Sequence, residues 1–528
     1  MSVSAREERA ADTPRGVGRS TAIFAVWTGV SRVAGLLREV ISAAIFGTQG
    51  AINAFVIAFA VPNLLRSLVA DSALSAAFLP VFTELEEQGR DREARRLAGA
   101  LVGVICVGLG LVTLLAVVTA PWVMPLFAPG LSPELVDETV RLSQIMFPIV
   151  VLLGLTGLVA ALLQANGRFG ATAFVPVLWN MVIIAMLLAI TPFVSDEHQI
   201  TVYAIAIVVG TLAQLLYLLP SLRGLGPFPL SLGLGNPHVR RVLVLMAPVT
   251  LGLGLINVNL VVDGAFASLV SDDSVRAIEA AFRLYLLPQG VFSVAIATVL
   301  FPTISRLAAR EDWEGMRRTL ADGMRQIFFL LVPASAFLLA LSDPVVRLVY
   351  QRGVFDAAST SITAEALFFF AIGLAFNGAS LLVIRAFFSM QLPALATKVA
   401  AFGVVLNAAL DAAFYRPFGT GGIPLATSIG SIATFLLLVF FLERELGGLH
   451  RAWVLDGIVR IVIASGVSVL LAWGFWYVID GALGRSLGAQ LLSMGAALTA
   501  ATLAYLAAAQ AFELRELSVL SRLVRPLR

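Results

Sequence analysis

Residues 20–47 read STAIFAVWTGVSRVAGLLREVISAAIFG, and residues 51–82 read AINAFVIAFAVPNLLRSLVADSALSAAFLPVF. Both stretches are long and apolar enough to form helices in a lipid bilayer, yet Arg32, Arg38 and Arg66 lie inside them. An arginine at membrane depth costs about 2.5–3.5 kcal/mol on insertion scales, so it is retained where it faces water, a paired anion or an anionic ligand. Three such arginines predict a polar cavity that attracts negative charge.

The composition of the whole chain is that of a polytopic membrane protein. Of the 528 residues, 59% are hydrophobic and 13% are charged, whereas soluble proteins carry about 25% charged residues. The net charge of +3 is too small to favour nucleic-acid binding. The single cysteine excludes a disulfide framework and a multi-thiolate metal site. The polar segment 1–19 predicts a disordered cytoplasmic tail rather than a cleaved signal peptide.

Apolar runs of membrane length recur along the chain and predict fourteen transmembrane helices. Each run has on the order of 20 residues or more, enough to cross about 30 Å of hydrocarbon. Arginines concentrate in the loops after even-numbered spans, whereas most odd-numbered loops are acidic or neutral, which places both termini in the cytoplasm. The spans lie at about 20–46, 50–83, 97–126, 138–165, 172–194, 200–221, 241–270, 277–305, 318–345, 360–389, 395–417, 421–442, 453–480 and 484–513.

An internal repeat divides these helices into two lobes. In SAAFLPVFTELEEQGRDREARRL (75–97) and ATVLFPTISRLAAREDWEGMRRTL (297–320), a proline precedes an arginine pair by 15 residues. The offset is six spans, so the repeat is parallel; chance likeness between apolar helices is the alternative. The prediction is an all-α membrane protein with an N-terminal lobe at 20–221, a cytoplasmic linker at 222–240, a C-terminal lobe at 241–442, two additional spans at 453–513 and a cytoplasmic tail at 514–528.

Polar residues of spans one, two and eight supply a candidate substrate site. Arg32 and Arg38 are about 120° apart around a helix, and a bend at Gly35 would turn both toward one cavity. A carboxylate at Glu39 can hold an arginine when no ligand is bound. Guanidinium groups bind phosphate oxygens bidentately, which predicts a phosphate or diphosphate clamp; snorkelling to the surface is the alternative. The set is Arg32, Arg38, Arg66, Arg283, Glu39, Asn53 and Asp71.

A second polar set lies in the second half of the chain. Asn407 and Asp411 are four residues apart and share a helix face. Carboxylate, amide, hydroxyl and carbonyl oxygens suit a small cation such as sodium, or a proton relay; interhelical hydrogen bonds are the alternative. No other cofactor is expected, and the scattered histidines and lone cysteine supply no catalytic cluster, so we do not expect an enzyme. The set is Asp263, Asn407, Asp411, Thr427 and the carbonyl of Ile423.

The two opening spans resemble the MurJ/MviN family of lipid II flippases, as do AFRLYLLPQGVFSVAIATVLFPTISRLA (281–308), VVRLVYQRGVFDAASTSITAEAL (345–367) and the span count. The resemblance implies a multi-pass protein of the bacterial inner membrane that moves undecaprenyl-diphosphate-linked disaccharide-pentapeptide to the outer leaflet for peptidoglycan synthesis, cell wall biogenesis and cell shape. It implies alternating access of two lobes, a lipid-tail groove in the last two spans, and functional roles for the four arginines, Glu39 and the sodium set. We expect a monomer whose partners are lipid II and membrane lipid.

The chain departs from the family pattern at several cavity positions. The family often has Asp where Asn53 stands, Arg where Ser67 stands and an acidic residue where Phe282 stands, and the stretch from Asp71 also differs. These departures leave open the exact lipid-linked substrate and whether sodium or the membrane potential drives transport. The alternative function is a related polysaccharide-precursor flippase or cation-coupled multidrug exporter of the same superfamily, which would not need four arginines at one cavity.

Overall fold

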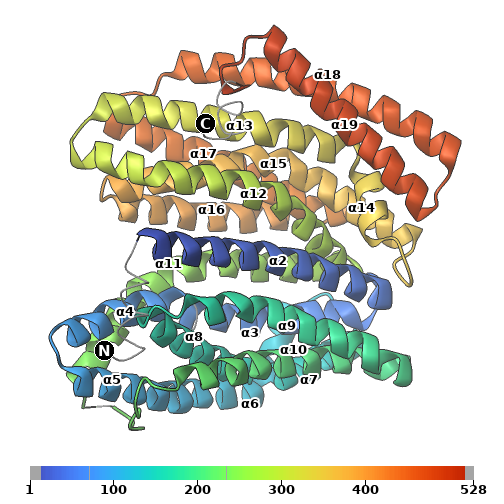
Figure 1. The fold of residues 1–528 in the computed structure, drawn as a ribbon. Helices are drawn as coiled ribbons and strands as arrows, with labels where there is room; N and C mark the ends of the chain where they lie inside the picture. Colours follow the sequence, from blue (N-terminus) through green and yellow to red (C-terminus); the bar gives the residue numbers. More distant parts are fainter. Residues whose placement is uncertain (1–13, 70–71, 234, 518–528) are drawn as a thin grey trace. The chain divides into compact units, whose positions relative to one another are not determined.

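A computed structural model describes the backbone of residues 14–69, 72–233 and 235–517. At 14–25, 66–69, 72–73, 75–76, 247–249 and 251–257 it describes the backbone alone. Every regular element in these ranges is helical (Figure 1), which confirms the all-α prediction for this part of the chain. The helices group by packing into two compact units, Met1–Ser268 and Leu269–Arg528, called unit 1 and unit 2 below.

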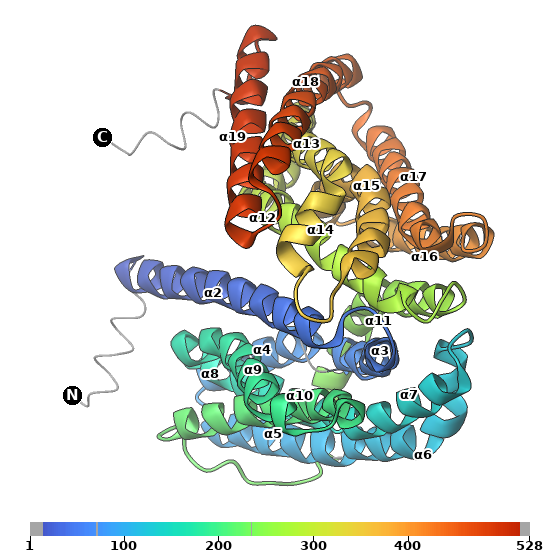
Figure 2. The ribbon, with the colours of Figure 1, turned by 90° about the vertical axis from the view of Figure 1, so that its right-hand side faces the viewer.

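Unit 1 contains the helices drawn from blue to green in Figure 2. They are α2 (Pro14–Phe46), α3 (Ala51–Val69), α4 (Ser72–Glu87), α5 (Asp91–Val104), η1 (Ile105–Leu109), α6 (Gly110–Phe127), α7 (Pro133–Met146), α8 (Ile149–Ala165), α9 (Phe169–Ile190), η2 (Thr191–Phe193), α10 (Asp196–Leu218), η3 (Leu219–Leu222) and α11 (Pro237–Ser268). Its core brings α3, α4, α8 and α10 together, and the rings of Phe55 and Tyr203 stack with centroids 4.2 Å apart. The helix α2 packs along α9 and thereby places Arg38 against the bundle.

Unit 2 follows from Leu269. It contains α12 (Ser274–Ala309), α13 (Trp313–Ala340), α14 (Ser342–Tyr350), α15 (Ala357–Ser389), α16 (Pro393–Phe414), η4 (Gly419–Gly421), α17 (Gly422–Leu446), α18 (Arg451–Leu483) and α19 (Leu487–Ala511). The central helix is α15, on which α12, α13, α14, α16 and α17 pack. It begins at a capped end, because the Asp356 carboxylate accepts a hydrogen bond from the Ser359 amide at 2.8 Å, which holds the pKa of Asp356 below its usual value.

Eleven helices within the described ranges are long and apolar enough to cross a membrane, and Ala51–Leu65 and Val258–Ser268 are shorter apolar helices. The chain is therefore a multi-span helical membrane protein. The count of fourteen and the parallel repeat stay predictions. The two lobes predicted from the sequence also stay a prediction, because the two compact units are defined by helix packing and not by the repeat.

The Gly- and Pro-rich linker (222–240) packs against α5. The carbonyl oxygens of Pro229 and Ser231 pass so close to Gly99 and Gly103 that a Cβ atom on either glycine would lie 2.1 Å from them. A small-xxx-small pair on a helix allows this close approach of another backbone. The start of α11 is tied to the end of α4, since Arg241 pairs with Glu84 at 2.9 Å. These contacts place α11 in unit 1.

Two buried arginines fasten the α18–α19 hairpin to the rest of unit 2. Arg325 of α13 lies over the Trp453 ring, 3.8 Å from its centroid, and pairs with Glu516 beyond α19. Arg347 of α14 pairs with Asp480 near the other end of α18. Because buried ion pairs cost several kcal/mol when one partner is removed, both ends of α18 are firmly held.

Candidate functional site

The residues of α2 that were assigned to the substrate site differ in their environments. The helix is continuous through Gly35, with Arg32 exposed and Arg38 and Glu39 buried. A continuous helix can still curve, so the bend at Gly35 stays a prediction. A Cβ atom on this glycine would lie 3.9 Å from the Asn180 amide, so the position marks close packing between α2 and α9.

Arg38 is held by a carboxylate and an aromatic ring. Its Nη2 donates to Glu39 Oε1 at 2.5 Å, and its guanidinium carbon lies 4.7 Å from the centroid of the Trp179 ring. The indole N–H of Trp179 donates in turn to Thr211 Oγ1 at 3.2 Å. An arginine stacked on an anchored ring and paired to a carboxylate keeps its planar donors in a fixed direction.

This arginine retains a donor that the described residues leave unused. Arg38 Nε is buried and has no hydrogen-bond partner in the part of the chain that the structure describes. A buried, unsatisfied charged donor costs about 1–3 kcal/mol or more. The arrangement can therefore gain from an anionic oxygen that reaches Nε, which is the chemistry expected of a phosphate ligand.

Of the other residues assigned to the substrate site in the first half of the chain, the structure describes the side chain of Asn53 but not those of Arg66 and Asp71. Asn53 is fully buried, and its Nδ2 donates to the carbonyls of Thr48 at 2.6 Å and Gly50 at 3.3 Å, so it fastens the loop before α3. Its role in substrate binding stays a prediction. Arg66 lies in α3, but its side chain, like all of Asp71, lies outside the described residues.

In unit 2 the predicted arginine Arg283 belongs to a larger ionic group on α12. Glu279 accepts from Arg283 Nη2 at 3.0 Å and from Arg276 Nη1 at 2.5 Å. The Arg276 side chain is 3% exposed, whereas that of Arg283 is 41% exposed. One carboxylate thus bridges a buried and a half-exposed guanidinium. The sequence pattern missed Arg276 and Glu279, although their spacing of three and four residues from their partners was a usable signal.

The second polar set lies partly at the contact between α16 and α17. Asn407 Nδ2 donates to Asp411 Oδ2 at 3.0 Å, and both residues are buried. The register of the two helices follows from close approaches: Gly403 faces Thr434, Asn407 Oδ1 faces Gly430, and the carbonyl of Phe414 faces Gly422.

This register runs antiparallel and brings Asp411 level with the segment from Ile423 to Thr427. Thr427 Oγ1 donates to the Ile423 carbonyl at 3.1 Å. Four of the five assigned residues therefore come together at one helix contact, and their oxygens are of the kind that fits a sodium ion.

The fifth residue, Asp263, belongs to unit 1. It is buried, and it accepts from Asn259 Nδ2 at 3.1 Å on the same helix. Asp411 belongs to unit 2, and the approach of Asp263 to Asp411 stays a prediction. Within the described ranges, no group of three or more His, Cys, Asp or Glu side chains could hold a metal ion, which leaves neutral oxygens to complete any site around Asp411.

Comparison with known proteins places these features in a family context. The family model described as lipid II flippase MurJ matches residues 42–487. The lipid II flippase MurJ of Burkholderia cenocepacia is 31% identical over 431 residues, covering 79% of this chain and 82% of that protein. The probable lipid II flippase MurJ of Bdellovibrio bacteriovorus is 28% identical over 517 residues, covering 96% and 97%.

Two solved structures share the fold. One is a lipid II flippase MurJ in an inward closed conformation, with a TM-score of 0.77 and 24% identity over 93% of this chain and 98% of that chain. The other is an inward-facing multidrug resistance MATE family transporter of the MOP superfamily, with a TM-score of 0.67 and 13% identity over 79% and 94%. At these identities the likeness concerns the fold alone.

Proposed function

The chain belongs to the lipid II flippase MurJ family, and from this premise we infer that it is a lipid II flippase of the bacterial inner membrane. It moves the lipid-linked peptidoglycan precursor from the inner to the outer leaflet and catalyses no covalent change. The family match over residues 42–487 is the single observation that carries this function. The MATE-like structural neighbour is the reason to keep a cation-coupled exporter as a second candidate.

Within this function we propose that Arg32, Arg38, Arg66 and Arg283 bind the diphosphate of the cargo. The proposal is supported by the unused Nε of Arg38 and by the exposure of Arg32. Glu39 serves as the internal counter-ion that the phosphate replaces when cargo enters. Asn53 and Asp71 complete the polar lining.

The finer architecture is also part of the proposal. Fourteen spans form two six-helix lobes with two additional helices, both termini are cytoplasmic, and the monomer works by alternating access. Arginine enrichment of the even-numbered loops supports the orientation.

We also propose that the membrane potential or sodium assists the cycle. The sodium ion would be bound by Asp263, Asn407, Asp411, Thr427 and the carbonyl of Ile423. Moving one charge through 100 mV is worth about 2.3 kcal/mol, which a positively charged cavity can use to reset after it releases an anion. Transport in vesicles should slow when the potential is collapsed. If the transport rate is the same with and without the membrane potential and sodium, neither of them drives transport.

Complementation tests the function. A bacterium depleted of its own lipid II flippase should regain growth and normal shape when it expresses this chain, and the Arg32→Ala variant should not restore either. Lipid II on the outer leaflet should be measured directly alongside growth. If the inserted wild-type protein moves no lipid II outward but exports a cationic drug, the protein is an exporter and not a lipid II flippase.

A further inference from the structure

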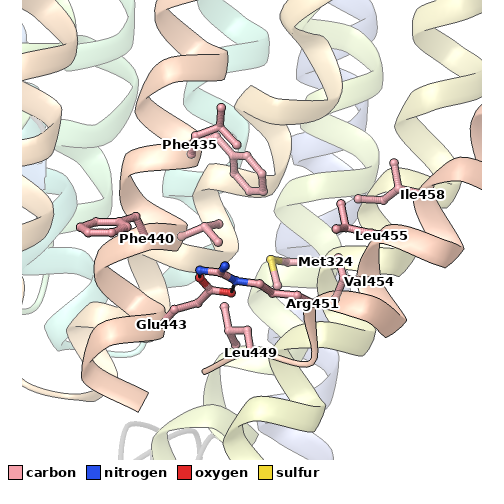
Figure 3. Close-up of a pocket in the computed structure, with 11 residues that line it drawn as sticks. Met324, Phe435, Phe440, Glu443, Leu449, Arg451, Val454, Leu455 and Ile458 are labelled. Atoms are coloured by element: carbon pink, nitrogen blue, oxygen red, sulfur yellow. Dashed lines mark hydrogen bonds and ion pairs between the residues drawn. The ribbon is translucent and has the colours of Figure 1, made fainter. Parts of the chain in front are cut away.

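A crevice of about 260 Å³ opens between α13, α17 and α18 in unit 2. Its walls are apolar: Phe435 and Val439 come from α17, Val454 and Ile458 come from α18, and Met324 comes from α13. Figure 3 shows α17 and α18 on either side of the gap, with Met324 of α13 between them. The volume lies below the roughly 300–1,000 Å³ of pockets that enclose drug-sized molecules, so it suits a single hydrocarbon chain.

The crevice opens on a surface of membrane character. Leu436 and Phe440 of α17 and Leu455 of α18 line it and are each more than half exposed. Exposed leucine and phenylalanine on membrane-length helices face hydrocarbon. A chain from the surrounding leaflet can therefore enter sideways, without passing through the interior of the protein.

An ion pair closes one end of the crevice. Arg451 Nε donates to Glu443 Oε1 at 2.6 Å, and its Nη2 pairs with Oε2 of the same carboxylate. In Figure 3 the two side chains meet across the gap between α17 and α18. The Glu443 side chain is 8% exposed and that of Arg451 is 70% exposed, so the guanidinium covers the carboxylate.

The outer edge of this guanidinium is available for an anion. A guanidinium has five N–H donors, and the pair with Glu443 uses only the edge formed by Nε and Nη2. Nη1 has no partner among the described residues. Exposed Arg444 and Glu445 offset each other, while α18 begins at Arg451 and adds the positive end of its dipole.

We propose that this crevice binds one anionic glycerophospholipid of the cytoplasmic leaflet. One acyl chain lies along Val439 and Ile458, and the phosphate lies against the outer edge of Arg451. The leaflet follows from the proposed topology, in which the loop between α17 and α18 is cytoplasmic. This site lies outside the arginine clamp and does not depend on what the cavity transports.

The headgroup, rather than the chain, must give the selectivity. A chain that moves from lipid to an apolar crevice gains little, because both surroundings are hydrocarbon. An interfacial arginine attracts an anionic headgroup strongly enough for about a fivefold preference. The proposal therefore predicts discrimination between headgroups that carry the same chain.

Photo-crosslinking in liposomes tests this directly. The full-length chain is reconstituted in phosphatidylcholine that contains a minor fraction of phosphatidylglycerol with a photoactivatable acyl chain. Crosslinked peptides spanning 435–458 are then counted by mass spectrometry. We expect about fivefold more labelling than with phosphatidylcholine that carries the same chain, and unlabelled phosphatidylglycerol should compete.

Two variants and two matched controls locate the site. Val439→Trp fills the crevice, and the double variant E443Q/R451Q removes the charged mouth without leaving a buried carboxylate unpaired. E443Q/R451Q should reduce labelling by phosphatidylglycerol about fivefold, to the level of phosphatidylcholine. Val439→Trp should reduce labelling by both lipids, because it excludes the acyl chain. Leu470→Trp, at an exposed position of α18, and Arg485→Gln, beyond the other end of that helix, should leave it unchanged.

Three outcomes would overturn the proposal. Equal labelling by both headgroups would mean that only bulk lipid contacts the crevice. Labelling that survives both Val439→Trp and E443Q/R451Q would place the bound lipid elsewhere. Stronger labelling by a photoactivatable undecaprenyl phosphate than by phosphatidylglycerol would assign the crevice to the isoprenoid tail of the cargo.

Discussion

Replacing Glu39 by glutamine tests the arginine clamp most directly, because it removes the carboxylate that holds Arg38 and keeps the arginine. The two side chains are 9% and 6% exposed, and Arg38 Nη2 lies 2.5 Å from Glu39 Oε1. Removing one partner of a buried pair costs about 3–5 kcal/mol. The Trp179 ring stays in place and retains about 1 kcal/mol of attraction. Because that attraction is the same in both proteins, we expect the ligand-free variant to lose about 3–5 kcal/mol of stability.

The same variant should respond more strongly to a diphosphate ligand. In the wild type a phosphate must displace the Glu39 carboxylate from Arg38, whereas in Glu39→Gln it meets a guanidinium without its counter-ion. A charge-assisted hydrogen bond is worth about 1.5–3 kcal/mol, so affinity should rise at least about tenfold. Thermal unfolding of the purified protein with undecaprenyl diphosphate measures this, and undecaprenol controls for the tail.

Glu93→Gln is the matched control for stability. Glu93 pairs with Arg90 at 2.6 Å, but the side chains are 41% and 43% exposed, and water screens an exposed pair so that it adds little to stability. This variant should unfold close to the wild-type temperature. The clamp reasoning fails if undecaprenyl diphosphate stabilises Glu39→Gln no more than the wild type, or if undecaprenol stabilises it equally.

Three further predictions concern other parts of the chain. Arg32→Ala and Arg66→Ala should each abolish transport in protein that still inserts and folds, with lysine rescuing poorly because it loses bidentate geometry; normal complementation by both would contradict the clamp. Asp411→Ala should lose sodium-dependent thermal stabilisation, measured in sodium against choline chloride; unchanged stabilisation would leave that carboxylate a packing role. Gly99→Ala should cost about 1–3 kcal/mol, because its Cβ would lie 2.1 Å from a linker carbonyl; Gly108→Ala, with open space, is the control, and equal unfolding temperatures would contradict the linker contact.

The sequence predicted the features that depend on residues close together along the chain. Long apolar runs indicated a membrane protein, and Glu39 beside Arg38 indicated a local counter-ion. The anionic ligand and the orientation of the termini stay predictions. These features can be predicted from sequence because the free-energy cost of a charged side chain in lipid and the spacing of side chains on a helix depend on one segment alone.

The missing parts of the prediction are contacts between distant segments. Trp179 lies under Arg38 but is 141 residues away in sequence, and nothing in the α2 pattern points to it. The sequence predicts a linker between lobes, but nothing in its Gly- and Pro-rich pattern indicates that it packs on Gly99 and Gly103. The contacts of Asn53 with the carbonyls of Thr48 and Gly50 were not predicted either, and its role in substrate binding stays a prediction.

The arginines of this chain share one electrostatic arrangement that bears on transport. Arg38 pairs with Glu39, and Arg283 pairs with Glu279. The family often has an acidic residue where Phe282 stands, and Glu279, one helical turn earlier, supplies a carboxylate near that position. A counter-ion supplied by the protein offsets the cost of holding a charged guanidinium when no cargo is present, at the buried Arg38 more than at the half-exposed Arg283. If these arginines bind the cargo as proposed, binding exchanges a carboxylate for a phosphate, and its net free energy is smaller than that of filling an unpaired site. A carrier gains from this, because a cargo held too tightly on one side would not be released on the other.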